Sequence, residues 1–399
     1  MIDLKAARAE PERFREALAR KGAAEAFDAL LEADARWRAL VPQVDDLRGR
    51  TKLKGKPSPE QLEELQQVKT ELKRVEDELA AAEEERDRLA LLVPNPPHES
   101  VPTGESEDDA VEVRRIGEPP QLAEPREHTE IGRFDMDRAA KLSGSRFGYW
   151  VGDTALLALA LYRLALDRLT DKGFVPVLPP VLVRENALVG TGWLPADEPA
   201  IYAIEDTDLM LAATAEIPLG GLHAGEILEA AELPLRYVGF SPCFRSEAGA
   251  AGRDTRGMFR VHQFNKVEQF AFTRPEDSWD EHERLLANTE EIVRELDLSY
   301  RVVVLPAGDM SKASAKTYDV ELWFPSQERY RETGSISNTT DFQARRLETR
   351  YRGERGIEPV HTLNGTAVVD RMALAILENF QGDVPDVLRS YGAPERVTG

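Results

Sequence analysis

Residues 244–270, FRSEAGAAGRDTRGMFRVHQFNKVEQF, combine arginines, carboxylates and aromatic rings in one stretch. On a strand, Arg245 and Glu247 would share a face, and so would Phe264 and Glu268, because side chains alternate. Glycines between the two pairs predict a turn-rich connection. The two strands would thus present arginines, a flat ring and carboxylates from opposite ends of a loop. A charged surface hairpin is the alternative from this stretch alone.

The elements around this hairpin predict an antiparallel sheet. Residues 153–173 predict a helix that is capped by Asp153 and ends at Gly173. Extended segments are predicted at 174–183, 233–247, 258–273 and 318–337. Strands joined by short turns indicate antiparallel pairing. The sequence has neither a G-x-G-x-x-G turn after a predicted strand nor a G-x-x-x-x-G-K-[ST] loop, so it offers neither common nucleotide-binding fingerprint.

Residues 27–93 predict two antiparallel helices with heptad spacing. Ser58 as N-cap and Pro59 at the first helical position should start the second helix, and Pro42 should kink the first. Five basic residues and no acid lie between the helices, at Arg48, Arg50, Lys52, Lys54 and Lys56. This basic tip on an acidic rod is either a solvated turn or a contact for a polyanion.

Composition indicates a globular protein with a strongly acidic surface. The 399 residues carry a formal net charge of −21, which argues against DNA binding over the whole surface but leaves room for a local basic patch. The single cysteine, Cys243, forbids an internal disulfide and a cysteine-based zinc site. The first 22 residues are charged throughout, and no segment is apolar enough for a membrane span, so we expect a cytoplasmic protein.

Three separated stretches resemble the signature motifs of class II aminoacyl-tRNA synthetases. SGSRFGYWVGD with the following helix resembles the first motif, residues 244–270 the second, and HTLNGTAVVDRMALAILENFQ the third. TAE at 214–216, GDMSKASAKTYDVELWFP and RETGSISNTTDFQARR are similar to segments of bacterial-type seryl-tRNA synthetases. The helical hairpin 27–93 resembles the tRNA-binding arm of that family, so the resemblance covers nearly all of the chain.

This resemblance implies an α+β fold, in which a class II antiparallel β-sheet is flanked by helices and preceded by a helical-hairpin (coiled-coil) arm. The implied domains are an arm at 1–98, a linker at 99–115 and a catalytic domain at 116–399. The implied activity is activation of L-serine with ATP and Mg²⁺ to seryl-adenylate, and transfer of serine to the 3′ end of tRNASer, with tRNASec as a further acceptor. The resemblance also implies a homodimer, and it implies no zinc cofactor.

The resemblance also assigns the serine site. Serine is recognised through its ammonium and hydroxyl groups, because its side chain is small. Glu268 is implied to bind one or both of these groups, and Arg245 to bind the carboxylate. The remaining serine-binding residues implied in this way are Thr214, Ala215, Glu216, Asn364 and Thr366.

The implied catalytic residues are Arg245, Glu268 and Arg371. The serine carboxylate attacks the α-phosphorus of ATP, so two anions must meet, and fixed guanidinium groups would lower that barrier. Arg245 matches the arginine expected at the α-phosphate, and Arg371 the one near the γ-phosphate and over one face of adenine. The implied ATP-binding residues are Arg245, Ser246, Glu247, Val261, Phe264, Glu332, Thr333, Gly334, Ser335 and Arg371.

Magnesium prefers oxygen ligands, and the resemblance assigns it to Glu332 and Ser335. The tRNA contacts are assigned to the basic tip of the arm and to Arg253 and Arg256 in the loop of the opening hairpin.

The third motif departs from the family pattern. LNGTAVVDR is one residue shorter between Asn364 and Arg371 than the form expected from many members, and Asp370 directly precedes the arginine. Gly334 stands where a bulkier residue is expected. Three readings follow: a housekeeping synthetase, a duplicate that serves inhibitor resistance or biosynthesis, and a non-catalytic tRNA-binding relative. Retention of Arg245, Glu268 and Arg371 argues against the last.

Overall fold

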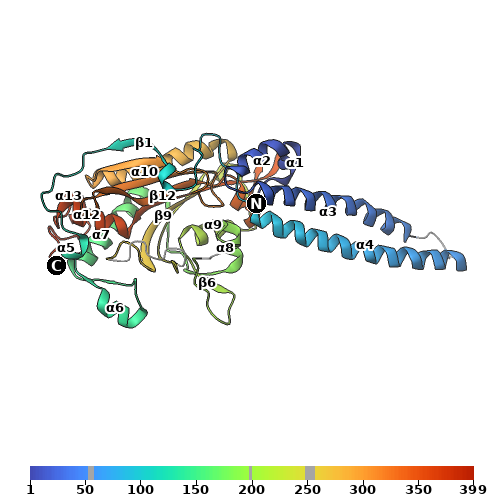
Figure 1. Cartoon of the computed structure of the whole chain (residues 1–399), viewed down its shortest axis with the longest axis horizontal. Coiled ribbons are helices and arrows are strands. Elements are labelled where there is room, and N and C mark those ends of the chain that lie inside the picture. Colours follow the sequence, from blue (N-terminus) through green and yellow to red (C-terminus); the bar gives the residue numbers. More distant parts are fainter. Residues whose placement is uncertain (53–57, 197–199, 248–256) are drawn as a thin grey trace. The chain divides into compact units, whose positions relative to one another are not determined.

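The computed structural model describes residues 1–52, 58–196, 200–247 and 257–399 (Figure 1). It divides into two compact units, Met1–Pro96 and Pro97–Gly399. The helices of the first unit are α1 (Leu4–Ala9), α2 (Pro11–Ala19), α3 (Ala24–Arg50) and α4 (Pro59–Leu92).

Helices α3 and α4 form the predicted hairpin and lie side by side along most of their length (Figure 1). Buried apolar residues make the seam between them, among them Val44 and Val75, as the heptad spacing requires. The Ser58 Oγ accepts a hydrogen bond from the Gln61 N–H at 3.3 Å, and the Gln61 Oε1 accepts one from the Ser58 N–H at 2.8 Å, so the predicted cap is confirmed as a capping box. Helix α3 runs through Pro42 without a break.

An eight-stranded sheet forms the centre of the second unit, in the order β1-β10-β11-β12-β15-β9-β8-β4. Its strands are β1 (Val111–Ile116), β4 (Val175–Val177), β8 (Leu235–Phe244), β9 (Gln263–Thr273), β10 (Tyr300–Val304), β11 (Lys316–Phe324), β12 (Arg329–Asn338) and β15 (His361–Val369). Neighbours pair antiparallel, except that β4 runs parallel to β8 at one edge. Strand β1, at the other edge, begins inside the segment predicted as a linker.

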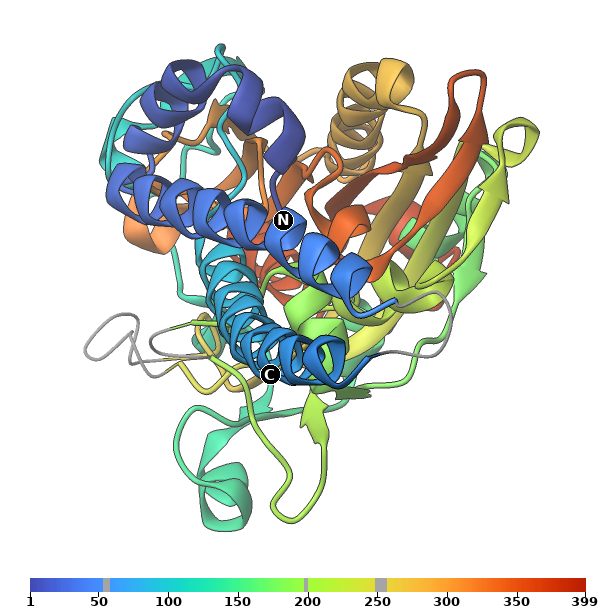
Figure 2. The ribbon, with the colours of Figure 1, turned by 90° about the vertical axis from the view of Figure 1, so that its right-hand side faces the viewer.

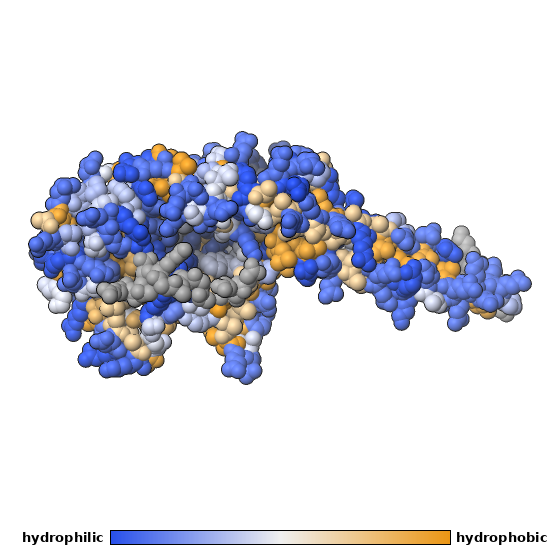
Figure 3. Space-filling view, in the orientation of Figure 1, coloured by the Kyte–Doolittle hydropathy of each residue, from blue (hydrophilic) through white to orange (hydrophobic). Residues whose placement is uncertain are grey.

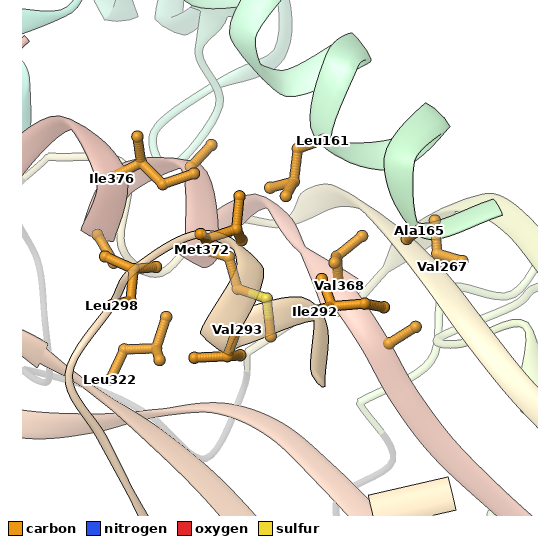
Figure 4. Packing of buried hydrophobic residues seen from close by; sticks show 14 of the residues in the cluster. Leu161, Ala165, Val267, Ile292, Val293, Leu298, Leu322, Val368, Met372 and Ile376 are labelled. Atoms are coloured by element: carbon orange, nitrogen blue, oxygen red, sulfur yellow. The ribbon is translucent and has the colours of Figure 1, made fainter. Parts of the chain in front are cut away.

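One face of this sheet is covered by helices α7 (Asp153–Asp171), α10 (Ser278–Glu295) and α12 (Asp370–Phe380). Figure 4 shows Leu161 of α7, Ile292 of α10 and Met372 of α12 packed together with residues of the strands. Figure 2 shows α10, in gold, beside the strands. Burial of this apolar surface supplies most of the driving force for folding of the unit.

Helix α7 starts differently from the prediction. Its N-cap is Gly152 rather than Asp153, and no side chain caps it. Asp153 is the first helical residue, and its Oδ2 accepts a hydrogen bond from the Thr398 hydroxyl at 2.8 Å. The helix ends at Asp171, and Gly173 follows two residues later with a left-handed φ of 86°, which favours glycine. The predicted role of Gly173 in ending the helix is therefore confirmed.

Shorter elements connect the sheet and the helices. The further helices are α5 (His128–Ile131), α6 (Met136–Ser143), α8 (Glu185–Thr191), α9 (Glu216–Gly220), α11 (Phe342–Leu347) and α13 (Asp386–Arg389). The further strands are β2 (Phe134–Asp135), β3 (Tyr149–Trp150), β5 (Leu182–Arg184), β6 (Leu209–Leu211), β7 (Ile227–Glu229), β13 (Arg350–Gly353) and β14 (Gly356–Pro359).

Candidate active site

A cavity of about 240 Å³ lies against the sheet, on the face away from the covering helices. Phe264, Lys266 and Glu268 of β9 line it, whereas Val267 and Gln269 point to the helix side. The alternation predicted for this strand is therefore confirmed. The sequence-predicted site residues that line the cavity are Thr214, Glu216, Arg245, Glu247, Val261, Phe264, Glu268, Glu332, Thr333, Ser335, Asn364, Thr366 and Arg371.

Three predicted site residues do not line this cavity. Ala215 is fully buried and packs in an apolar cluster with Leu219 and Phe270. Gly334 packs closely against Thr366. A Cβ atom added at Gly334 would lie 3.2 Å from the Cβ of Thr366. The backbone N–H of Ser246 donates to the Ala200 carbonyl at 3.1 Å. Arg253 and Arg256 lie outside the described residues.

The arginine of the second motif lies beyond the strand that was expected to carry it. Strand β8 ends at Phe244, so Arg245 and Glu247 do not alternate along a strand as predicted. The guanidinium of Arg245 lies over the Phe264 ring, 5.2 Å from its centroid, and its Nε donates to the Ala213 carbonyl at 3.4 Å. Glu247 adopts a left-handed φ of 53° and forms an ion pair with Arg260.

At one end of the cavity, a lysine and a carboxylate are buried together. Glu268 is 1% exposed and forms an ion pair with Lys266, whose Nζ also donates to the Thr214 hydroxyl at 2.7 Å. The Oε2 of Glu268 is the atom in contact with the Lys266 ammonium group. An ionised carboxylate has several acceptor sites, so beside Lys266 it can still accept from a ligand with N–H or O–H donors.

A second carboxylate faces the same end. The Oε1 of Glu216 accepts hydrogen bonds from the Gln343 amide at 2.8 Å and the Asn364 amide at 3.1 Å. Burial, helped by the charge of Glu268, raises the pKa of Glu216 to about 7. This end therefore combines two carboxylates with one ammonium group and suits a small cationic ligand group.

At the other end, Arg371 is the second residue of α12 and is held by three acceptors. Its Nε donates to the Phe259 carbonyl at 3.2 Å, and its Nη1 donates to the carbonyl and the carboxylate of Glu332 at 2.8 and 3.0 Å. Burial acts to raise the pKa of Glu332, but the charges of Arg371 and Arg245 outweigh it, so the pKa lies below its usual value.

Two β-bulges set which side chains reach the cavity. Glu332 and Ser335 are three residues apart and would face opposite sides of a regular strand. Thr333 is an extra residue against β11, between the pairs Val320–Gly334 and Glu321–Glu332, so both side chains line the cavity.

Several cavity residues were missed from the sequence: Trp193, Met258, Phe259, Arg260, Lys266, Ser311, Ser314, Ser337, Val369 and Asp370. Lys266 could have been found, because it has the same parity as Phe264 and Glu268 on one strand. Residues 311 and 314 belong to a connection whose path the sequence pattern does not specify.

The basic tip of the arm is only partly described. Arg50 ends α3 and Lys52 follows it, while Arg48 forms an ion pair with Glu76 of α4 at 2.8 Å. Lys54 and Lys56 lie outside the described residues. In the view of Figure 3, hydrophilic residues dominate the end of the hairpin at which α3 ends and α4 begins.

The antiparallel sheet and the arginine-lined cavity agree with a family comparison. The model for the tRNA synthetase class II core domain (G, H, P, S and T) matches residues 202–380, and that for the seryl-tRNA synthetase N-terminal domain matches residues 1–97. The fold and the cavity together define a class II aminoacyl-tRNA synthetase.

Individual relatives indicate which amino acid this synthetase class member uses. The chain is 43% identical to the serine–tRNA ligase of Geobacter sulfurreducens over 98% of each chain. It superposes with a TM-score of 0.92 on the seryl-tRNA synthetase of Pyrococcus horikoshii complexed with ATP, at 40% identity, over 100% of this chain and 99% of that chain. The cytoplasmic serine–tRNA ligase of Naegleria fowleri complexed with AMP gives a TM-score of 0.87 and 32% identity over 97% and 95% of the two chains.

The chain therefore belongs to the seryl-tRNA synthetase family and is a serine–tRNA ligase. The alternative of a non-catalytic relative is not favoured.

Proposed function

We propose that this ligase forms seryl-adenylate in the cavity between Glu268 and Arg371. The observation that carries the proposal is the buried Glu268 carboxylate, paired with Lys266, at the opposite end from the Arg371 guanidinium held in the same cavity. The first end suits the serine ammonium and the second suits the phosphates of ATP. Arg245, between them, suits the carboxylate and the α-phosphate that react.

At the serine end, we assign the ammonium to Glu268 and Glu216, and the hydroxyl to the neighbourhood of Thr366 and Asn364. Thr214 acts through Lys266, to which it is hydrogen-bonded. A site built from buried polar groups rejects alanine and glycine by roughly 10⁴–10⁵, because those groups would be left unpaired.

At the nucleotide end, we assign the adenine ring to the face of Phe264. The Arg245 guanidinium already lies over this ring, and Arg371 lies over the Phe259 ring at 4.6 Å. Stacking on an aromatic surface recognises the base without metal or charge. Glu247 is the proposed acceptor for the adenine amino group, because a carboxylate that is paired with Arg260 through one oxygen has further acceptor sites. The backbone of Val261 and the segment 332–335 complete the ATP site.

We assign Mg²⁺ to Glu332 and Ser335, because the donor set fits a metal that is shared with phosphates. The described residues contain no group of three or more His, Cys, Asp or Glu side chains arranged for a metal, so substrate oxygens and water must complete the coordination. The buried Asp319 pairs with Ser335 across β11 and β12, and its Oδ1 has no hydrogen bond within the described residues. When bound, the ion neutralises charge on the phosphates.

The transfer step requires tRNA, and we assign tRNASer to the arm. Arg48, Arg50 and Lys52 at the described end of α3 form the beginning of the basic tip, where phosphates would be attracted. The same arm would serve tRNASec. Contacts at the acceptor end are proposed for Arg253 and Arg256.

We further propose a cytoplasmic homodimer. Helix α7 exposes Leu156 and Leu159, 46% and 58% accessible, and Leu178 between β4 and β5 is 81% accessible. Large exposed apolar side chains of this kind are typical of subunit interfaces. No described helix has the length and apolar character needed to cross a membrane.

The test is ATP–pyrophosphate exchange measured with each of the twenty amino acids. Serine alone should support exchange, and Arg245→Ala should abolish it, because the α-phosphate and the serine carboxylate lose their shared cation. Arg138→Ala, which removes an exposed arginine on α6, is the matched control. Absence of serine-dependent exchange in the native protein would refute the proposed function.

A further inference from the structure

The third motif contains a buried acid that the proposed function does not use. Asp370, which directly precedes Arg371, lines the cavity and is 5% exposed. Its Oδ2 accepts a hydrogen bond from the Asn265 backbone N–H at 3.0 Å, and its Oδ1 accepts one from the Tyr162 hydroxyl. One side chain thus joins α12, β9 and α7.

The position of Asp370 follows from where two strands stop pairing. Strand β15 is irregular after Thr366, where Ala367 is an extra residue, and its last pair with β9 is Val369–Lys266. The chain then turns into α12, so the backbone can no longer follow β9 to Asn265. The Asn265 N–H therefore has no carbonyl partner from β15. The carboxylate of Asp370 accepts the hydrogen bond from this N–H in place of a strand carbonyl.

We propose that Asp370 is a positioning residue of the ATP site, which ties the first turn of α12, and with it Arg371, to the strand that carries Phe264. This inference rests on the function proposed above. Phe264 directly precedes Asn265, and Arg371 directly follows Asp370, so one hydrogen bond fixes the backbone between the proposed adenine platform and the proposed phosphate ligand. Glu332 and the Phe259 carbonyl hold the other end of the Arg371 side chain.

The hydrogen bonds and the charge of Asp370 favour a positioning role over a role in packing alone. A buried carboxylate is costly unless it is well hydrogen-bonded, and here two donors and the positive N-terminus of α12 offset the cost. Burial raises the pKa of Asp370 to about 6, against the opposing effect of the Tyr162 and Asn265 hydrogen bonds. The group is therefore mainly ionised at neutral pH, beside the arginine that it places.

The test compares Asp370→Ala, Asp370→Asn and Tyr162→Phe in ATP–pyrophosphate exchange. Asp370→Ala should lower kcat about 10- to 100-fold and raise KM for ATP while KM for serine stays unchanged, because a small displacement of Arg371 affects the nucleotide only. Asp370→Asn retains an acceptor for the Asn265 N–H and should restore most of the activity. Tyr162→Phe removes one donor and leaves that contact intact, so its loss should be smaller.

Asp386→Ala is the matched control, since Asp386 is also the first residue of a helix, α13, and is exposed. Unchanged kcat in Asp370→Ala, equal losses in the alanine and asparagine variants, or equal rises in KM for serine and ATP would overturn the inference. If the native chain itself shows no exchange, the proposed function fails and this inference fails with it.

Discussion

Serine binding should weaken at acidic pH because of Glu216. This carboxylate has a pKa of about 7, which burial and the Glu268 charge raise, and it faces the proposed ammonium site. Only the ionised form attracts an ammonium group, and serine itself remains a zwitterion between pH 6 and 8. As the pH falls through 7, Glu216 takes up a proton and the competent fraction of the enzyme decreases.

The size of this effect follows from the ionised fraction. The apparent dissociation constant is the intrinsic constant divided by the competent fraction, so at pH 6, where about a tenth of Glu216 is ionised, KM for serine should be about tenfold above its value at pH 8. Glu216→Gln retains an oxygen for Gln343 and Asn364 but loses the charge. A hydrogen bond to a charged group contributes about 1.5–3 kcal/mol, so KM for serine should rise about 10- to 150-fold and lose its dependence on pH.

The assay is ATP–pyrophosphate exchange from pH 6 to 8.5, with KM for serine and for ATP measured at each pH. The pH profile of KM for ATP should be the same in the native protein and in Glu216→Gln, which controls for general damage. A native KM for serine that does not change over this range would refute the reasoning. So would an inflection near pH 7 that survives in Glu216→Gln, because another group would then be responsible.

Other parts of the molecule give further predictions. Removal of residues 48–58 should abolish charging of tRNASer while exchange continues, and equal loss of both activities would contradict the role of the arm. Leu156→Asp combined with Leu159→Asp should convert a dimer into monomers in light scattering; a mass that stays dimeric would place the interface elsewhere. Glu332→Gln should raise the Mg²⁺ concentration for half-maximal exchange at least about tenfold, and an unchanged requirement would remove Glu332 from the metal site.

A small part of the site could be predicted from local patterns, and the other site residues were assigned by the family resemblance. Phe264 and Glu268 were placed on one face by strand alternation, and the structure confirms that both line the cavity. The capping box at Ser58 is a local signal of the same kind, because its two hydrogen bonds join residues three positions apart. Such features depend on backbone geometry that neighbouring residues determine among themselves.

What the sequence could not predict depends on contacts between distant segments. The hydrogen bonds of Glu216 come from Gln343 and Asn364, which are brought to it by α11 and β15. The bulge at Thr333 depends on pairing with β11 and reverses the expected face of Glu332. Alternation alone would have placed that carboxylate on the side of the sheet away from Ser335.

The charges of the cavity support the proposal that a divalent cation accompanies ATP. Of the described residues that line it, four are cationic (Arg245, Arg260, Lys266 and Arg371) and five are acidic (Glu216, Glu247, Glu268, Glu332 and Asp370). Serine adds no net charge, and ATP adds several negative charges. With Glu216 ionised, the loaded site would repel its own ligand unless Mg²⁺ entered with the phosphates. Because Arg371 is paired with Glu332 in the free protein, an ion at Glu332 would also release this arginine to the phosphates.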